Sequence, residues 1–250
     1  MTRPDYVVSD LHLGAVPVEK ERAFAAFLDH VGTHARSLLI NGDLFDFWFE
    51  YGEVVPGRHF RILARLAELV DAGIPVTYIG GNHDAWGGKF LRDTVGIRFH
   101  NGLLRTELGG RNALIAHGDG LGTGDLRYRT LKAFVRNPAI IGLFRLIPPQ
   151  IGMRIARGAS RTEHRTDTAK TSGRAQFLRD WGLGQLATDP ALSFVICGHS
   201  HLPDLAQAEP GRWYLNAGDW IHHDSYIVIP PDSAPQFYRW TNGPAPLQIA

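Results

Sequence analysis

Tyr6-Val7-Val8 followed directly by Ser9-Asp10-Leu11-His12 is the stretch of sequence that decides the fold. The apolar residues favour a buried strand, and the polar residues then come at the end of that strand. The same arrangement returns four times further along the chain. Each time an apolar, strand-like run precedes a short polar cluster; the four clusters are Asn41-Gly42-Asp43, Gly81-Asn82-His83-Asp84, His117-Gly118-Asp119 and Gly198-His199-Ser200-His201. Because α/β sheets place their sites on loops at strand ends, we expect the five clusters to converge.

The side chains of these clusters are carboxylates, imidazoles and an amide, which together suit two divalent cations. Taken singly, the clusters also have ordinary explanations. Asn41-Gly42-Asp43 is a common turn sequence, and His199 and His201 would lie on one face of any strand. Five such clusters, each after an apolar run, are hard to explain as turns alone. We therefore interpret the chain as a hydrolase with a dinuclear metal site.

Composition is consistent with one sizeable α/β domain. The chain has 250 residues, of which 44% are hydrophobic and 20% charged. Its single cysteine, Cys197, excludes a disulfide within the chain. We expect Cys197 to be a core residue. We expect no signal peptide, because the N-terminus leads through the polar residues Thr2-Arg3-Pro4-Asp5 directly into a strand. We expect no membrane-spanning segment, because no run of about 18 apolar residues occurs. A cytoplasmic protein is the corresponding expectation.

Periodicity predicts alternating helices and strands. Apolar residues recur at helical spacing over 18–31 and 60–71, with Gly73 as the C-cap of the second helix. Strands are predicted at 98–99, 103–108, 113–116, 193–197, 212–216, 226–229 and 236–240, and broken helices over 125–181. The predicted fold is α/β (α+β): a sheet sandwich with outer helices and a helical insert beside the site.

The five clusters, in this order, resemble the motifs of the calcineurin-like metallophosphoesterases. Within that superfamily the chain resembles the UDP-2,3-diacylglucosamine pyrophosphatases. The closer likeness rests on Gly42-Asp43-Leu44-Phe45-Asp46-Phe47-Trp48, on the insert after His117-Gly118-Asp119, and on the ending Tyr214-Leu215-Asn216-Ala217-Gly218-Asp219-Trp220. The resemblance implies one β-sandwich domain flanked by helices over 1–250, with a helical cap insert at 121–185.

The resemblance also implies the metal ligands and the cofactors. Asp43 would bridge two ions; the remaining ligands would be Asp10, His12 and His201 for one ion, and Asn82, His117 and His199 for the other. Manganese is the expected metal, with iron, zinc, magnesium or cobalt as alternatives. Asp84 and Asp119 lie beside ligands, and would either orient histidines or simply cap turns.

His83, together with Asn82, forms the predicted catalytic pair. A histidine can protonate a leaving oxygen near neutral pH, so His83 is the candidate general acid. Most calcineurin-like phosphoesterases carry histidine at this position, whereas many UDP-2,3-diacylglucosamine pyrophosphatases carry arginine. This difference from the nearer family bears on the identity of the substrate rather than on the metals. Arginine binds a diphosphate through several hydrogen bonds, whereas histidine donates or accepts a proton.

The insert is strongly basic. Residues 127–179 carry ten Arg and two Lys against one Glu and one Asp, a net charge of +10 in a chain of net charge +1. Arginine among bulky apolar residues suggests a cap that touches an anionic headgroup, acyl chains and the inner membrane surface. A solvated helical face is the plain alternative, and a nucleic-acid partner is not expected because aromatic residues are few there. The resemblance implies substrate contacts at Asp125, Tyr128, Ser160, Arg161 and Lys170.

Two further clusters stay open at this stage. The aromatic residues after Asp43 and Asp84 would form either an apolar lip for the substrate or ordinary core; they are Phe47, Trp48, Phe49, Tyr51 and Trp86. His222 and His223 are expected at the surface rather than in a third metal site.

The predicted function is hydrolysis of UDP-2,3-diacylglucosamine to UMP and an acylated glucosamine 1-phosphate, a step of lipid A biosynthesis. A phosphodiesterase or phosphatase acting on a soluble substrate, such as a cyclic nucleotide, is the first alternative. A binding module that kept the fold without turnover is the second, although such proteins usually lose ligands. The sequence leaves the oligomeric state and the acyl-chain length open.

Overall fold

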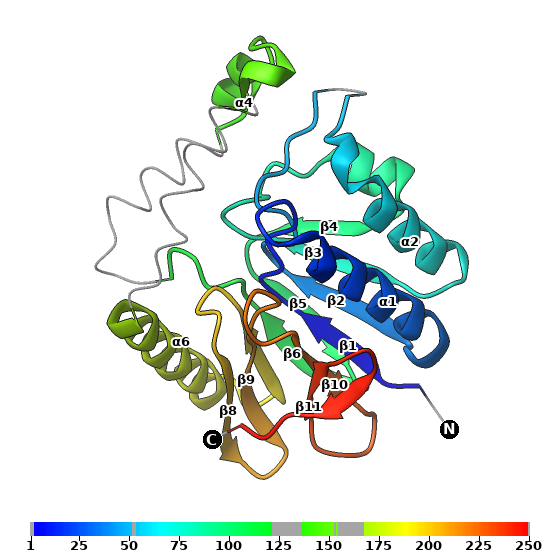
Figure 1. Ribbon diagram of the computed structural model, residues 1–250. Helices are drawn as coiled ribbons and strands as arrows, with labels where there is room; N and C mark the ends of the chain where they lie inside the picture. Colours follow the sequence, from blue (N-terminus) through cyan, green and yellow to red (C-terminus); the bar gives the residue numbers. More distant parts are fainter. Residues whose placement is uncertain (1–2, 52–53, 122–136, 153, 155–167, 250) are drawn as a thin grey trace.

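Two facing β-sheets form the centre of the computed structural model, which describes the chain except for residues 1–2, 52–53, 122–136, 153, 155–167 and 250 (Figure 1). The first sheet has seven strands in the order β12-β11-β10-β1-β2-β3-β4 and the second has five in the order β5-β6-β7-β9-β8. The strands of the first sheet are β1 (Asp5–Val8), β2 (Ser37–Asn41), β3 (Val76–Gly80), β4 (Arg98–Asn101), β10 (Ser225–Ile229), β11 (Gln236–Trp240) and β12 (Pro244–Pro246). Those of the second are β5 (Leu104–Leu108), β6 (Arg111–Ile115), β7 (Phe194–Cys197), β8 (Pro203–Glu209) and β9 (Arg212–Ala217).

Helices cover the outer faces of the sandwich. α1 (Val18–His34) and α2 (Phe60–Asp71) pack on the first sheet, and α6 (Thr168–Thr188) packs on the second. The helix α4 (Pro138–Phe144) begins at Asn137, whose side chain accepts a hydrogen bond from the Ala139 amide (2.9 Å). The described residues also include a 3₁₀ turn at Gly57–His59, a π turn at Phe90–Thr94 and a short helical segment at 149–152. None of the described helices is long and apolar enough to cross a bilayer.

Side-chain alternation along the central strands builds the layers. Val7 of β1 faces the space between the sheets, while Tyr6 and Val8 face α1 on the other side. In the second sheet Ile196 points between the sheets, and Cys197 points toward α6. The predicted sandwich with outer helices is therefore confirmed, and Cys197 is a core residue as expected.

The predicted element boundaries agree closely with the structure in the interior and less well at the edges. The second predicted helix and the strand 236–240 have the observed bounds, and the first helix continues three residues further, to His34. Two edge strands, β8 and β12, were not predicted. Polar residues in β8 and prolines in β12 hide the strand pattern, because an edge strand needs fewer apolar residues and tolerates proline.

The predicted insert 121–185 falls partly outside the described residues. Its C-terminal part forms most of α6, whose Leu178 packs against Val195 and Tyr214 of the second sheet. This part of the predicted insert thus covers the sheet as a layer of the sandwich, because its apolar side matches the outward face of β7 and β9. The existence of a single cap over 121–185 stays a prediction.

Candidate metal centre

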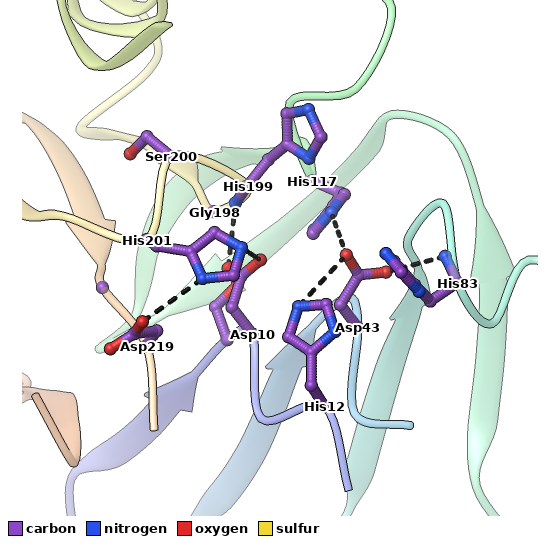
Figure 2. Close-up of polar contacts among 12 residues, drawn as sticks. Asp10, His12, Asp43, His83, His117, Gly198, His199, Ser200, His201 and Asp219 are labelled. Atoms are coloured by element: carbon purple, nitrogen blue, oxygen red, sulfur yellow. Dashed lines mark hydrogen bonds and ion pairs between the residues drawn. The ribbon is translucent and has the colours of Figure 1, made fainter. Parts of the chain in front are cut away.

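Five loops bring the predicted ligands together at one end of the sandwich. β1, β2 and β3 run parallel, and their carboxyl ends deliver Asp10 with His12, Asp43, and Asn82 with His83. β6 and β7 run parallel in the other sheet and deliver His117, and His199 with His201. Figure 2 shows the carboxylates and imidazoles of these loops pointing toward one another. The convergence expected from the five clusters is confirmed.

Asp43 lies in the middle of the site. Its carboxylate is 1% exposed; Oδ2 lies 3.2 Å from Nε2 of His117 and 3.8 Å from Nε2 of His12. Oδ1 accepts a hydrogen bond from the His83 amide (3.0 Å). The ligand atoms form three groups, each within 4.8 Å, that fit a metal ion: Asp10, His12 and His201; His12, Asp43 and His83; Asp43, His117 and His199. Asp43 therefore stands between the two sides of the site, as a bridging ligand would.

The Asp10 side of the site also has a spare ligand atom. Oδ1 of Asp10 is buried and has no hydrogen-bond partner among the residues that the structure describes, while Nε2 of His201 lies 3.5 Å away. Oδ2 of the same carboxylate is used, because it accepts from the His199 amide (2.9 Å) and from the Ser9 hydroxyl. A buried oxygen without a partner is costly, and a cation would satisfy it. The residues present thus fit a divalent metal.

The backbone of the site is strained in a consistent way. Seven non-glycine residues in the described part of the chain have positive φ, and five of them are predicted ligands: Asp10 (53°), His12 (49°), Asp43 (52°), His199 (63°) and His201 (62°). Such conformations are uncommon outside glycine and concentrate at functional sites, where surrounding structure holds them. This feature supports the ligand set independently of the distances.

Close approach of the loops explains two glycines of the clusters. A Cβ atom on Gly42 would lie 2.1 Å from Nδ1 of His117, and one on Gly81 would lie 2.1 Å from Oδ1 of Asp43. Gly42 also has φ of +88°. Any larger residue at either position would displace a predicted ligand.

Electrostatics couple His117 to Asp43. Burial alone would lower the pKa of His117, but the nearby Asp43 carboxylate raises that pKa to about 10. Burial would likewise raise the pKa of Asp43, yet the positive charges of His117 and His83 hold that pKa well below its ordinary value. Asp43 is therefore an anion at neutral pH even though it is buried. A divalent cation bound beside this anionic oxygen would displace the proton from Nε2 of His117.

Backbone carbonyl groups fix two of the imidazoles. Nδ1 of His117 donates to the Asn41 carbonyl (2.8 Å), which leaves its Nε2 toward Asp43. Nδ1 of His83 donates to the Asp46 carbonyl (2.8 Å), and the Asp46 carboxylate lies 3.9 Å from the same nitrogen. In both rings a proton is held on Nδ1, so Nε2 is the nitrogen that faces the site.

Asp84 acts on the backbone in the described contacts. Its carboxylate accepts from the amides of Gly81 (2.8 Å), Asp43 (3.3 Å) and Phe45 (3.3 Å), and from the Tyr78 hydroxyl. Burial and then the Asp43 charge raise its pKa to about 6. Of the two roles left open, the turn cap is the one that these contacts support. Asp84 ties the Asp43 loop to the Asn82 loop.

The remaining predicted residues have different outcomes. Asn82 lies on the same loop as His83 and is half-buried, and its role as a ligand stays a prediction, as does the role of Asp119. Asp125, Tyr128, Ser160 and Arg161 lie outside the described residues, and Lys170 lies in α6 without a described side chain. The predicted substrate contacts are therefore untested.

Two residues near the site were not predicted as functional. Asp46 follows Asp43 by three residues and lies beside His12 and His83. Asp219 ends the loop after β9, and its carboxylate lies 3.2 Å from Nδ1 of His201. The sequence did contain a signal for Asp219, because Tyr214-Leu215 followed by Asn216-Ala217-Gly218-Asp219 repeats the pattern of an apolar run and a polar cluster.

Comparison with known proteins identifies the family. Residues 6–203 match the model of the calcineurin-like phosphoesterase family. A UDP-2,3-diacylglucosamine hydrolase of Porphyromonas gingivalis is 33% identical over 249 residues, covering 89% of this chain and 92% of its own. One of Pectobacterium carotovorum is 33% identical over 233 residues, covering 90% and 95%. Among solved structures, a dimetal phosphatase from Danio rerio aligns with a TM-score of 0.49 and 9% identity, covering 94% of this chain and 95% of its own. On the strength of the sequence matches, the chain belongs to the calcineurin-like phosphoesterase family of hydrolases.

Proposed function

We propose that this protein hydrolyses the pyrophosphate bond of UDP-2,3-diacylglucosamine, or of a closely similar nucleotide-sugar lipid, to UMP and an acylated sugar 1-phosphate. The observation that carries the proposal is the buried Asp43 carboxylate, which lies between Asp10, His12 and His201 on one side and His117 and His199 on the other. The curated relatives named UDP-2,3-diacylglucosamine hydrolase, which match nearly the whole chain, support the choice of substrate.

Two divalent ions would be held on either side of Asp43. Asp10, His12 and His201 would complete the ligands of one ion, and Asn82, His117 and His199 those of the other. When bound, two such ions activate water as a nucleophile and neutralise the charge on phosphate oxygens. Oxygen and imidazole ligands suit manganese, which we take as the native metal.

His83 would donate a proton to the leaving group. Its Nδ1–H is occupied by the Asp46 carbonyl, so Nε2 is the nitrogen that a substrate oxygen can meet. The ring lies 4.7 Å from that of His12, centroid to centroid, which places it at the edge of the centre. A positioned imidazole of this kind contributes about 10²- to 10⁴-fold to a rate.

An aromatic surface beside this loop would receive the acyl chains. Phe144 of α4 packs against Phe49 (ring centroids 4.9 Å apart) and Trp86 (5.0 Å). Trp48 and Phe49 are core residues, whereas Phe47, Tyr51 and Trp86 are half-buried and would form the apolar lip. Leu143 and Leu146 expose 63% and 79% of their surface next to Phe144. Exposed apolar side chains on a basic segment fit contact with acyl chains and with the cytoplasmic face of a membrane.

A soluble phosphodiester is the second candidate substrate, and His83 is the observation that favours it. A histidine whose Nδ1 is fixed by a hydrogen bond is suited to proton transfer through Nε2. An arginine at this position would instead be suited to binding a diphosphate through two hydrogen bonds. The two candidates differ in the apolar part of the substrate and not in the metals.

The test compares purified, manganese-loaded protein on UDP-2,3-diacylglucosamine, on the deacylated UDP-sugar and on bis(p-nitrophenyl) phosphate. We expect kcat/KM to be highest for the acylated substrate, with UMP as a product. Equal efficiency on the acylated and deacylated substrates would favour the soluble phosphodiester. Absence of turnover on all three, with both metals bound, would refute the proposed enzyme.

A further inference from the structure

The two carboxylate oxygens of Asp219 have different hydrogen-bond partners. Oδ2 lies 3.2 Å from Nδ1 of His201, a predicted ligand (Figure 2). Oδ1 accepts from the backbone amides of His222 and His223 (3.0 Å each) and from Nδ1 of His223 (2.8 Å). The side chain of Asp219 is fully buried. One oxygen thus faces the metal centre and the other closes a turn.

From this geometry we propose that Asp219 is a positioning residue of the metal centre: it holds the proton of His201 on Nδ1 and so directs Nε2 to the metal beside Asp10. The inference rests on the proposed metal centre but not on the proposed substrate. A carboxylate can only accept, so the hydrogen bond requires the proton on Nδ1 of His201. Nε2 then carries the lone pair, 3.5 Å from Oδ1 of Asp10.

His201 has greater need of such support than the buried ligands. Its side chain is 25% exposed, and its backbone has φ of +62°. Apart from Asp219, its ring stacks on the His12 ring, with centroids 5.1 Å apart. His117 is held by a neutral carbonyl at 2.8 Å, whereas His201 is held by a charged oxygen at 3.2 Å, and that negative charge makes Nε2 of His201 more basic.

The loop that carries Asp219 is tied to both neighbouring loops. Asn216 donates to the Gly198 carbonyl and to the Ser200 hydroxyl (2.9 Å each), and its own side-chain oxygen accepts from the Gly218 amide (3.0 Å). The amide of Trp220 donates to the Asp10 carbonyl (3.2 Å). Asp219 is therefore fixed relative to His201 and to Asp10 at once, as a positioning residue must be.

The electrostatics support an anionic Asp219. Burial would raise the pKa of this carboxyl, but the hydrogen bonds from His201 and His223 hold it below its ordinary value.

Asp219→Asn separates the positioning role from the turn. The two backbone amides of His222 and His223 require an acceptor, so the side-chain oxygen of Asn stays at the Oδ1 position. Its NH₂ group then faces Nδ1 of His201 and can only donate. His201 must shift its proton to Nε2 to accept this bond, and that tautomer cannot ligate the metal through Nε2.

The experiment measures bound manganese by mass spectrometry after dialysis against graded chelator, with no turnover involved. Wild-type protein should hold two ions. Asp219→Asn should bind one ion with wild-type affinity and the other about 10- to 100-fold more weakly. His201→Ala, which removes the ligand itself, should weaken binding of that same ion further. His223→Ala is the matched control: it removes another partner of the same carboxylate but leaves both backbone bonds, and it should keep both ions.

The outcomes separate this inference from the rest of the account. Two ions bound to Asp219→Asn with wild-type affinity, or equal loss in His223→Ala, would overturn it. Wild-type protein without two ions would overturn the metal centre as well. If Asp219→Asn does not fold by circular dichroism, Asp219→Ser replaces it, because a serine oxygen can still accept in the turn but is too short to reach His201. Full metal binding by that variant would overturn the inference equally.

Discussion

Replacing Asp43 by Asn tests the bridge between the two metal ions. The substitution keeps the side-chain volume and an oxygen that can accept from the His83 amide, and Asn tolerates the positive φ of 52° found here. The negative charge is removed, and Oδ2 is replaced by an NH₂ group that cannot ligate a metal. Because Oδ2 lies between His117 Nε2 at 3.2 Å and His12 Nε2 at 3.8 Å, that charge serves both sides of the site.

The expected effect is large for this reason. Changes that only disturb the support of a ligand cost about 10- to 100-fold in metal affinity, and Asp43 is a direct ligand in the proposal. We therefore expect each ion to bind more than about 100-fold more weakly, which corresponds to about 2.7 kcal/mol per ion. Turnover should fall by about 10³-fold or more, or about 4 kcal/mol in the barrier. Metal analysis after dialysis and steady-state kinetics at fixed manganese measure the two effects.

Glu50→Gln is the matched control for this prediction. Glu50 is also buried, lies seven residues along the chain, and accepts from the amides of Gly88 (2.8 Å) and Phe90 (3.0 Å), but it belongs to none of the three ligand groups. Its neutral variant should lose stability and keep both ions. If Asp43→Asn retains two ions at wild-type affinity, Asp43 does not bridge and the reasoning fails.

Three further predictions concern proton transfer, substrate and stability. His83→Ala should slow turnover by about 100-fold or more with both metals retained, and should hurt substrates with acidic leaving groups less; a uniform loss across an aryl phosphodiester series would contradict proton donation. Phe144→Ser with Leu146→Ser should lower kcat/KM for the acylated substrate and leave a small phosphodiester nearly unaffected, because each buried methylene contributes about 0.8 kcal/mol; equal losses would contradict an acyl surface. Burial and then the Arg58 charge lower the pKa of His59 to about 3. Below about pH 6.5 the unfolded chain therefore binds a proton that the folded protein does not, and the free energy of unfolding falls as the pH falls toward 3. At pH 5 this amounts to about 2 kcal/mol, which His59→Gln should abolish in urea unfolding; an unchanged pH dependence would contradict it.

The interior of the fold could be predicted because its signals are local. In α2, apolar residues at helical spacing and Gly73 after the last turn define both ends of the helix. The polar clusters lie at the ends of buried strands, so the direction of each loop followed from the strand itself. The edge strand β8 could not be predicted in this way, because it is held mainly by pairing with β9 and has polar residues along its exposed side.

Contacts between distant loops are the part that the sequence alone did not show. Asp219 meets His201 only because β9 pairs with β7, which is a property of the sheet order. Phe144 contacts Phe49 and Trp86 although they lie far before it in the chain, and no local sequence pattern records such a contact. The sequence left open whether Asp84 orients a histidine or caps a turn. The hydrogen bond from the Asp43 amide, which comes from another loop, supports the turn cap.

Anomalous diffraction from crystals grown with manganese tests the central claim most directly. The account predicts two peaks about 3.5–4 Å apart, both in contact with the Asp43 carboxylate. One should also contact Asp10 and His201, and the other His117 and His199. A single peak, or two peaks that do not share Asp43, would contradict a dinuclear centre built on these residues.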